Sequence, residues 1–365
     1  MNLPISAIDT ITLAFQHTKR QLIQPFRFWQ WTRLAIVGLL AGEMGSGGFN
    51  FPTNLNFPKQ DGSGRHFLAQ EFPKIDPAIL GTVIAIAVVA GLIFLLVMAY
   101  VSSVMRFVLF DSVLAKECHI RAGWSGRQGP AWKLFLWHLS VILVAGVVGV
   151  ILVGVPAAFA FAMGWFNSPR DHILPFVLGG IVVFGFLLLF FIALAIVQVL
   201  TKDFVVPQMA LENIGALEGW RRLWPMIQME KGGYAIYIGM KIVMALGAGI
   251  VIAIVSIFLV LLFAIPVVGV VFAVIFAGKG GGLSWNAFTI TAVIVAGCVM
   301  FAVFFYLIAL ISVPAIVFFP AYSIYFFAAR YRPLSAVLYP LPPVSAQDIP
   351  PPDLPPLPPY PQPAS

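Results

Sequence analysis

Three basic or protonatable residues recur along the sequence, each near the start of a long apolar segment. Each is followed, about two helical turns later, by an Ala-Gly pair. The positions are Arg33 before Ala41-Gly42, His138 before Ala145-Gly146, and Lys241 before Ala248-Gly249. If the segments are equivalent membrane helices, the three side chains lie at one depth, where a cationic ring could hold the phosphate or carboxylate of a lipid headgroup. We favour the alternative that Arg33 and Lys241 extend to the membrane surface and His138 bonds a backbone carbonyl, because charge costs less near a helix end.

Other polar residues form no diagnostic catalytic or metal-binding pattern. Asp111, Asp203 and Glu218 have no His, Ser or second carboxylate at a useful spacing. Cys118-His119 is a single adjacent pair, and a metal site needs more ligands. We therefore assign no catalytic, cofactor-binding or metal-binding residue and expect a protein that is not an enzyme.

Composition indicates that the candidate residues belong to membrane helices. Hydrophobic residues make up 61% of the chain and charged residues 10%, against about half and a quarter in soluble domains. Several apolar stretches reach the roughly 20 residues that a helix needs to cross a bilayer. The sequence therefore predicts an all-α integral membrane protein with about six transmembrane helices. The expected spans are Phe26 to Met44, Pro77 to Met105, Trp132 to Trp165, Ile173 to Leu200, Tyr234 to Ala277 and Ala287 to Phe319.

Two features complicate this assignment of spans. Arg33 interrupts the first span, whose short apolar part could also be the core of a signal peptide. The residues before it, which include Trp29 and Trp31, favour a membrane helix. Pro266 in the fifth span, and Pro314 with Pro320 in the sixth, predict a kink or a re-entrant turn, because proline removes a backbone donor.

The spans pair into three hairpins that repeat about every hundred residues. Phe107 to Leu114 matches Phe204 to Leu211, and Val317 to Ile324 follows more loosely. Each hairpin begins and ends on one side of the membrane, so the units are parallel repeats. The expected parts are an amphipathic segment 1–25, a six-helix transmembrane domain 26–330 with an outer loop 43–76 and cytoplasmic linkers 106–131 and 201–233, and a tail 331–365.

Amphipathic helices are expected on the cytoplasmic side. In segment 1–25 the apolar stripe is Ile5, Ile8, Ile11, Phe15 and Leu22, with His17, Lys19 and Arg20 on the wetter side. In linker 201–233, Trp220 and Trp224 follow an apolar stripe and Arg221 and Arg222 lie elsewhere on the helical wheel. Such stripes either lie among lipid headgroups or pack on neighbouring helices, and both can hold at once.

The distribution of positive charge predicts the orientation. Sixteen of the 21 Lys and Arg fall in residues 1–33, 106–133, 202–241 and 330–365, which places both termini in the cytoplasm. The net charge of +7 is then a topology signal that suits anionic headgroups and is no evidence for nucleic acid. The expected partner is the lipid bilayer.

The tail from Pro340 onward contains several PxxP spacings. Such a composition favours a disordered, extended chain with polyproline II character. It could bind a protein partner that reads proline-rich segments. The alternative, which we favour, is a semi-rigid disordered extension.

Three stretches carry a resemblance to known proteins: Arg106-Phe-Val-Leu-Phe-Asp111, Asp203-Phe-Val-Val-Pro207 with Ala216 to Trp224, and Phe318 to Phe327. With these, the chain resembles an uncharacterised bacterial family of multi-pass membrane proteins, similar to the membrane domain of glycerophosphoryl diester phosphodiesterases but without the phosphodiesterase domain. The resemblance implies a six-helix domain in a bacterial inner membrane and no hydrolase activity. We expect a non-enzymatic scaffold or accessory subunit, with a transporter or lipid-handling protein as the alternative.

Overall fold

A computed structural model describes residues 6–43, 77–166, 172–280 and 287–339, and every regular element among them is helical. Tail residues 340–365 and most of the expected outer loop, 44–76, lie outside the described residues. The elements are α1 (Asp9–Leu22), α2 (Phe28–Ala41), α3 (Pro77–Ala115), α4 (Ile120–Gly126), α5 (Gln128–Ala162), α6 (Ile173–Leu200), η2 (Thr201–Val205), α7 (Val206–Glu212), α8 (Ala216–Met229), α9 (Lys231–Gly280), α10 (Ala287–Ala328) and α11 (Arg332–Leu338).

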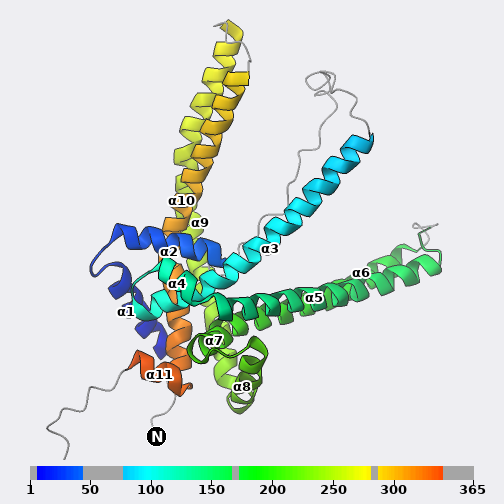
Figure 1. The fold of residues 1–365 in the computed structure, drawn as a ribbon. Helices are drawn as coiled ribbons and strands as arrows, with labels where there is room; N and C mark the ends of the chain where they lie inside the picture. The colour runs from blue at the N-terminus through cyan, green and yellow to red at the C-terminus, as the bar shows by residue number, and fades with distance from the viewer. Residues whose placement is uncertain (1–5, 44–76, 167–171, 281–286, 340–365) are drawn as a thin grey trace, which may run out of the picture.

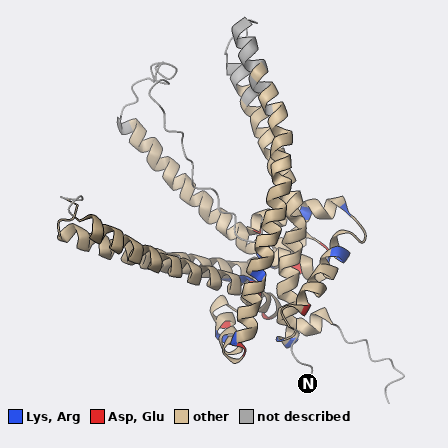
Figure 2. Cartoon of the chain, turned by 180° about the vertical axis from the view of Figure 1, so that it is seen from behind, with Lys and Arg blue, Asp and Glu red and all other residues tan. Residues whose placement is uncertain are grey.

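Three long arms project from a common base (Figure 1). The arms are α3 alone, α5 with α6, and α9 with α10. The base consists of the short helices α1, α2, α4, α7, α8 and α11 together with the adjoining ends of the long helices. Lys, Arg, Asp and Glu gather at the base, whereas the arms are almost free of them (Figure 2). The molecule is therefore divided into an apolar part and a charged part.

Five helices in the described residues are long and apolar enough to cross a membrane. The candidates are Ile79–Ala115, Gln128–Ala162, Ile173–Glu212, Lys231–Pro266 and Ile294–Ala328. In four of the five apolar windows no residue is buried inside the molecule. The arms thus present their apolar side chains outward, as helices in contact with lipid do. This confirms the expectation of an all-helical, multi-pass membrane protein.

The first expected span differs from the other five. Residues 26–44 contain α2, which has 14 residues and a length of about 21 Å, short of the roughly 30 Å of hydrocarbon. It ends at Gly42, whose φ of 77° closes the helix in the left-handed conformation. Gly38 lets α2 approach α10 so closely that a Cβ there would lie 2.5 Å from Ile316. The position of α2 is therefore determined by its close packing on α10 at the base.

The core of the protein lies at the base. Its largest fully buried side chains include Phe107 of α3, Phe204 of η2, Tyr237 of α9, and Tyr322 with Phe326 of α10. The rings of Tyr237 and Tyr322 stack with centroids 5.0 Å apart. Aromatic side chains bury much area with few rotatable bonds, so this cluster fixes how the ends of the three arms meet.

Helix α1 buries residues from both sides of the predicted helical wheel: His17 is buried, whereas Lys19 and Arg20 are exposed as expected. His17 contacts the carbonyl of Val113 at 2.9 Å and the hydroxyl of Tyr325 at 3.1 Å. Ile8 and Phe15, in contrast, are 60% and 64% exposed. The prediction that His17 faces water is wrong, because carbonyl and hydroxyl groups of α3 and α10 bond it instead. The predicted apolar stripe is therefore divided, because Ile11 is half-buried and Leu22 is buried in the base.

Two further differences concern the second half of the chain. Helices α9 and α10 continue through Pro266, Pro314 and Pro320, so the expected re-entrant turn is absent from the described part of the chain. The expected tail from residue 331 begins with the ordered helix α11, whose Leu334 is fully buried. The packed region therefore extends to the end of α11.

Candidate functional site

A π-helical turn carries two ionic side chains into the base. Helix α6 passes through η2 into α7 without a break, and η2 contributes Lys202 and Asp203. Lys202 pairs with Glu43, and Asp203 pairs with Lys241. The turn is wider than in an α-helix, and such turns are frequent at functional sites. Here it allows Lys202 to reach Glu43, just after the end of α2, and the next residue, Asp203, to reach Lys241 on α9.

Further hydrogen bonds extend the two ion pairs into a network. Tyr237 donates to Asp203 over 3.0 Å. On the other side, the guanidinium group of Arg106 lies 3.2 Å from Nε2 of His138 and 3.4 Å from the carbonyl oxygen of Ala41. We call Glu43, Arg106, His138, Lys202, Asp203, Tyr237 and Lys241 the charge network. It connects α2 and all three arms.

The hydrogen bonds of His138 determine its charge. Its Nδ1 lies 3.0 Å from the carbonyl oxygen of Leu134, which only accepts, so Nδ1 carries the proton. Its Nε2 faces Arg106, which only donates, so Nε2 is the acceptor. His138 is therefore neutral in this arrangement. The prediction that it bonds a backbone carbonyl agrees with this geometry.

The charge network has one more cation than it has anions. Arg106, Lys202 and Lys241 are positive, while Glu43 and Asp203 are negative. Among the described residues no carboxylate lies within ion-pair distance of Arg106. Because charges interact strongly where water is excluded, this excess of one positive charge favours an anion nearby.

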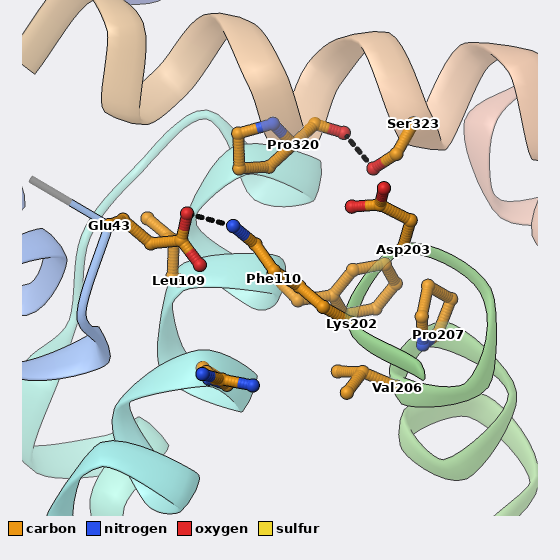
Figure 3. A pocket seen from close by; sticks show the side chains of 10 residues that line it. Glu43, Leu109, Phe110, Lys202, Asp203, Val206, Pro207, Pro320 and Ser323 are labelled. Carbon is orange, nitrogen blue, oxygen red and sulfur yellow. Dashed lines mark hydrogen bonds and ion pairs between the residues drawn. The ribbon is translucent and has the colours of Figure 1, made fainter. Parts of the chain in front are cut away.

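A small cavity lies inside the charge network (Figure 3). Its volume is about 30 Å³, and Glu43, Arg106, Lys202, Asp203 and Ser323 contribute its polar lining. That is room for one or two water molecules. It is too small for an organic ligand, so a larger molecule has to bind elsewhere.

A large apolar groove opens between α6 and α9. Its volume is about 740 Å³, and Lys241 is the single charged residue in its lining. Ala245, Gly249 and Ala253 line the groove at intervals of one helical turn, and their small size leaves room in the groove along α9. The remaining lining residues are Ile192, Ala195, Ile196, Val199, Ile238, Ile242, Leu246 and Ile250. From Lys241 to Ala253 the groove runs along about 18 Å of helix, close to the roughly 15 Å depth of one bilayer leaflet.

The structure brings together two of the three basic residues that the sequence singled out. His138 and Lys241 both belong to the charge network. Arg33 lies apart from it: its guanidinium group donates to the carbonyl of Cys118 over 3.3 Å and stands 5.5 Å from the ring of Trp29. A ring of all three is not formed, because Arg33 bonds Cys118, between α3 and α4, and does not join the charge network. Contact of these residues with anionic headgroups stays a prediction.

The predicted interfacial residues lie on α8. Trp220 is half-buried and donates to the hydroxyl of Thr201 in η2 over 3.0 Å. Trp224 is 55% exposed. Arg221 is exposed and pairs with Glu218, and Arg222 pairs with Glu212 and Glu218. Trp220 thus anchors α8 to the π-helical turn, while the side chains of Trp224 and Arg221 are exposed on its outer face.

Glu43, Arg106 and Lys202 belong to the site and were missed by sequence reasoning. Asp203 was noticed, but as an acid without a partner. The available signal was the rule that ionisable side chains in membrane segments pair with one another. Applied to Asp203, it would have pointed to Lys241, the nearest cation inside the next apolar span.

Five candidate spans on a charged base define a multi-pass membrane protein. The sequence matches the Family of unknown function (DUF7544) over residues 5–337, and the chain belongs to this family. No curated protein and no solved structure shows a significant match to it.

Proposed function

We propose that this membrane protein binds a lipid, with an acyl chain in the groove between α6 and α9 and the headgroup at Lys241. The observation that carries the proposal is the groove itself. Its walls are apolar over about the depth of one leaflet, and its one ammonium group lies at the end next to the base. Ligand sites of this kind combine an apolar cavity with a few polar groups that orient the ligand. This geometry favours lipid handling, the alternative expected from the sequence, over a purely structural role.

A scaffold or accessory subunit is the second candidate. The exposed side chains of Ile8 and Phe15 on α1, and the apolar side chains that the arms present outward, favour it. Exposed apolar patches of this kind mark interaction surfaces. Small residues four apart, such as Ala245 and Gly249, also let membrane helices pack closely. In that case the groove receives a helix from a partner. The protein is non-enzymatic in both proposals.

We also propose that both termini lie in the cytoplasm of a bacterium and that the arms cross its inner membrane. The two ends of the described chain meet at the base, since α1 and α11 both contact α10. The excess of Lys and Arg in the termini and linkers supports a cytoplasmic base. A sixth span, parallel repeats, interfacial helices and a tail that binds a partner belong to the same proposal. So does the resemblance to the phosphodiesterase membrane domain.

Filling the groove tests the lipid proposal. A Cβ added at Gly249 meets no atom within 4 Å, so Gly249→Phe can direct its ring into the groove. Gly247 on the same helix is equally open but does not line the groove, which makes Gly247→Phe the matched control. The full chain is purified from membranes in mild detergent, and retained lipid is counted by native mass spectrometry.

We expect about one tightly bound lipid per chain in the wild type and in Gly247→Phe, and loss of that lipid in Gly249→Phe. Equal lipid retention in both variants would refute the lipid site. If Gly249→Phe instead releases a co-purifying protein and no lipid, the groove receives a partner helix and the scaffold proposal holds.

A further inference from the structure

We infer that the groove selects lipids with a net negative headgroup, and that Lys241 makes the selecting contact. This inference rests on the lipid site proposed above and adds the chemical class of its ligand. It follows from the charge of the network, from the place of Lys241 within it, and from the way in which Asp203 is bonded.

The charge network contains an uncompensated positive charge. It has three cations and two carboxylates, and His138 is neutral because it donates to Leu134 and accepts from Arg106. A zwitterionic headgroup brings its own cation and leaves this excess unchanged. A headgroup with one net negative charge balances it, which lowers the cost of holding charge away from water.

Lys241 is the one cation of the network that lines the groove. Its side chain is 8% exposed. Arg106 and Lys202 line the small cavity instead and are absent from the groove lining. A headgroup whose chain occupies the groove therefore meets Lys241 first. The other two cations contribute only through their field.

The ammonium group of Lys241 has donors to spare. It carries three N–H groups, and Asp203 is its ion-pair partner among the described residues. Asp203 also accepts a hydrogen bond from Tyr237 over 3.0 Å. The carboxylate thus keeps a donor when Lys241 turns part of its hydrogen-bonding capacity toward a phosphate. Lys241 can bind an anion without leaving Asp203 unbonded.

The test compares lipids that share acyl chains and differ in charge. The full chain is reconstituted in nanodiscs of equal parts phosphatidylglycerol and phosphatidylcholine, extracted with detergent, and its retained lipids are quantified by mass spectrometry. We expect phosphatidylglycerol to be enriched about fivefold, the preference that one lysine gives near an anionic surface. This wild-type measurement needs no variant, so it stands even where a variant fails to fold.

Two double variants locate the contact. Lys241→Gln with Asp203→Asn removes the ion pair at the groove, and Arg127→Gln with Asp111→Asn removes a half-buried ion pair of the base outside the charge network. Each double variant deletes one cation and one anion, so the net charge of the network is the same in both. We expect the first to lose most of the enrichment and the second to retain it. Equal enrichment in the two variants would overturn the role of Lys241.

The outcomes separate this inference from the proposed function. Wild-type protein that retains both lipids equally, while Gly249→Phe still loses them, overturns the anionic selectivity and leaves the lipid site in place. Inorganic phosphate in millimolar excess should leave the bound lipid unchanged, because the acyl chain contributes to binding. Displacement by phosphate would show that the site takes a free anion, which contradicts a lipid ligand.

Discussion

Removing the negative partner of the buried ion pair should destabilise the protein more than removing the positive one. Asp203 and Lys241 have side chains 2% and 8% exposed. The variant Asp203→Asn leaves three cations with one carboxylate, whereas Lys241→Gln leaves two of each. In addition, Asp203 keeps the hydrogen bond from Tyr237 when Lys241 is replaced. The excess of positive charge in the network thus makes the two substitutions unequal.

The size of the difference follows from the cost of an unpaired buried charge. Breaking such a pair costs about 3–5 kcal/mol, and we assign this range to Asp203→Asn. For Lys241→Gln we expect about 1–3 kcal/mol, the cost of a buried hydrogen bond to a charged group. At roughly 2–3 °C per kcal/mol, the midpoints of thermal unfolding should differ by about 5 °C. Asp203→Asn should have the lower midpoint.

Tryptophan fluorescence of the full chain in detergent measures both midpoints, at a single heating rate so that the variants can be compared. The control is Glu117→Gln, which breaks the ion pair between Glu117 and Arg27. Their side chains are 56% and 59% exposed, respectively. A surface pair of this kind contributes about 0–1 kcal/mol. If Lys241→Gln proves as damaging as Asp203→Asn, or more so, the charge assignment of the network is wrong.

Three further predictions concern the base. Gly38→Ala should cost about 1–3 kcal/mol, because its Cβ would lie 2.5 Å from Ile316, and thermal unfolding measures it. Burial lowers the pKa of His17 below its usual value of 6.5, against the opposing effect of its backbone hydrogen bond, so the folded state prefers the neutral ring. Stability should therefore fall as the pH drops below about 6.5, and His17→Gln should flatten that slope in unfolding measured from pH 7 to pH 5. Arg127→Lys should cost about 1–3 kcal/mol of unfolding free energy, because the guanidinium group holds both oxygens of Asp111 at 2.7 and 2.8 Å.

Each of these predictions has a matched control. Gly91→Ala adds a Cβ in open space, His119→Gln alters an exposed histidine, and Arg221→Lys alters an arginine whose side chain is 81% exposed. An effect of Gly38→Ala or Arg127→Lys no larger than that of its control would contradict the packing described. An unchanged pH slope in His17→Gln would show that another group titrates.

Much of the fold could be predicted because apolar length is a property of the chain alone. Helix α6 occupies the same range, Ile173 to Leu200, as the predicted span. Helices α3 and α10 begin at the predicted residues, Pro77 and Ala287, but both run well past the predicted ends. There the helix leaves the apolar arm and enters the base. Hydropathy predicts the apolar arm, but it contains no information about the packing in the base that continues the helix.

The site was harder to predict because its partners are distant in the sequence. Glu43 and Lys202 are separated by 159 positions and Asp203 and Lys241 by 38. The repeat placed Arg33 at the same depth as His138 and Lys241, but Arg33 bonds the carbonyl of Cys118 and lies apart from the charge network. Helix α2 also approaches α10 closely at Gly38, and no periodicity in the sequence carries that information. The prediction that His17 faces water failed for a similar reason, since a carbonyl group of α3 and a hydroxyl group of α10 bond it.

The charge network is difficult to explain by stability alone. Buried ion pairs replaced by apolar residues of similar size often leave a protein equally stable or more stable, and the apolar arms show that such residues are abundant in this chain. Two ion pairs and an arginine with no carboxylate within ion-pair distance among the described residues are a costly way to join helices. The same groups suit a site that holds an anion at the end of an apolar groove, where Lys241 belongs to the network and to the groove at once. The proposed recognition of a charged amphiphile therefore accounts for both the position and the sign of the buried charge better than packing does.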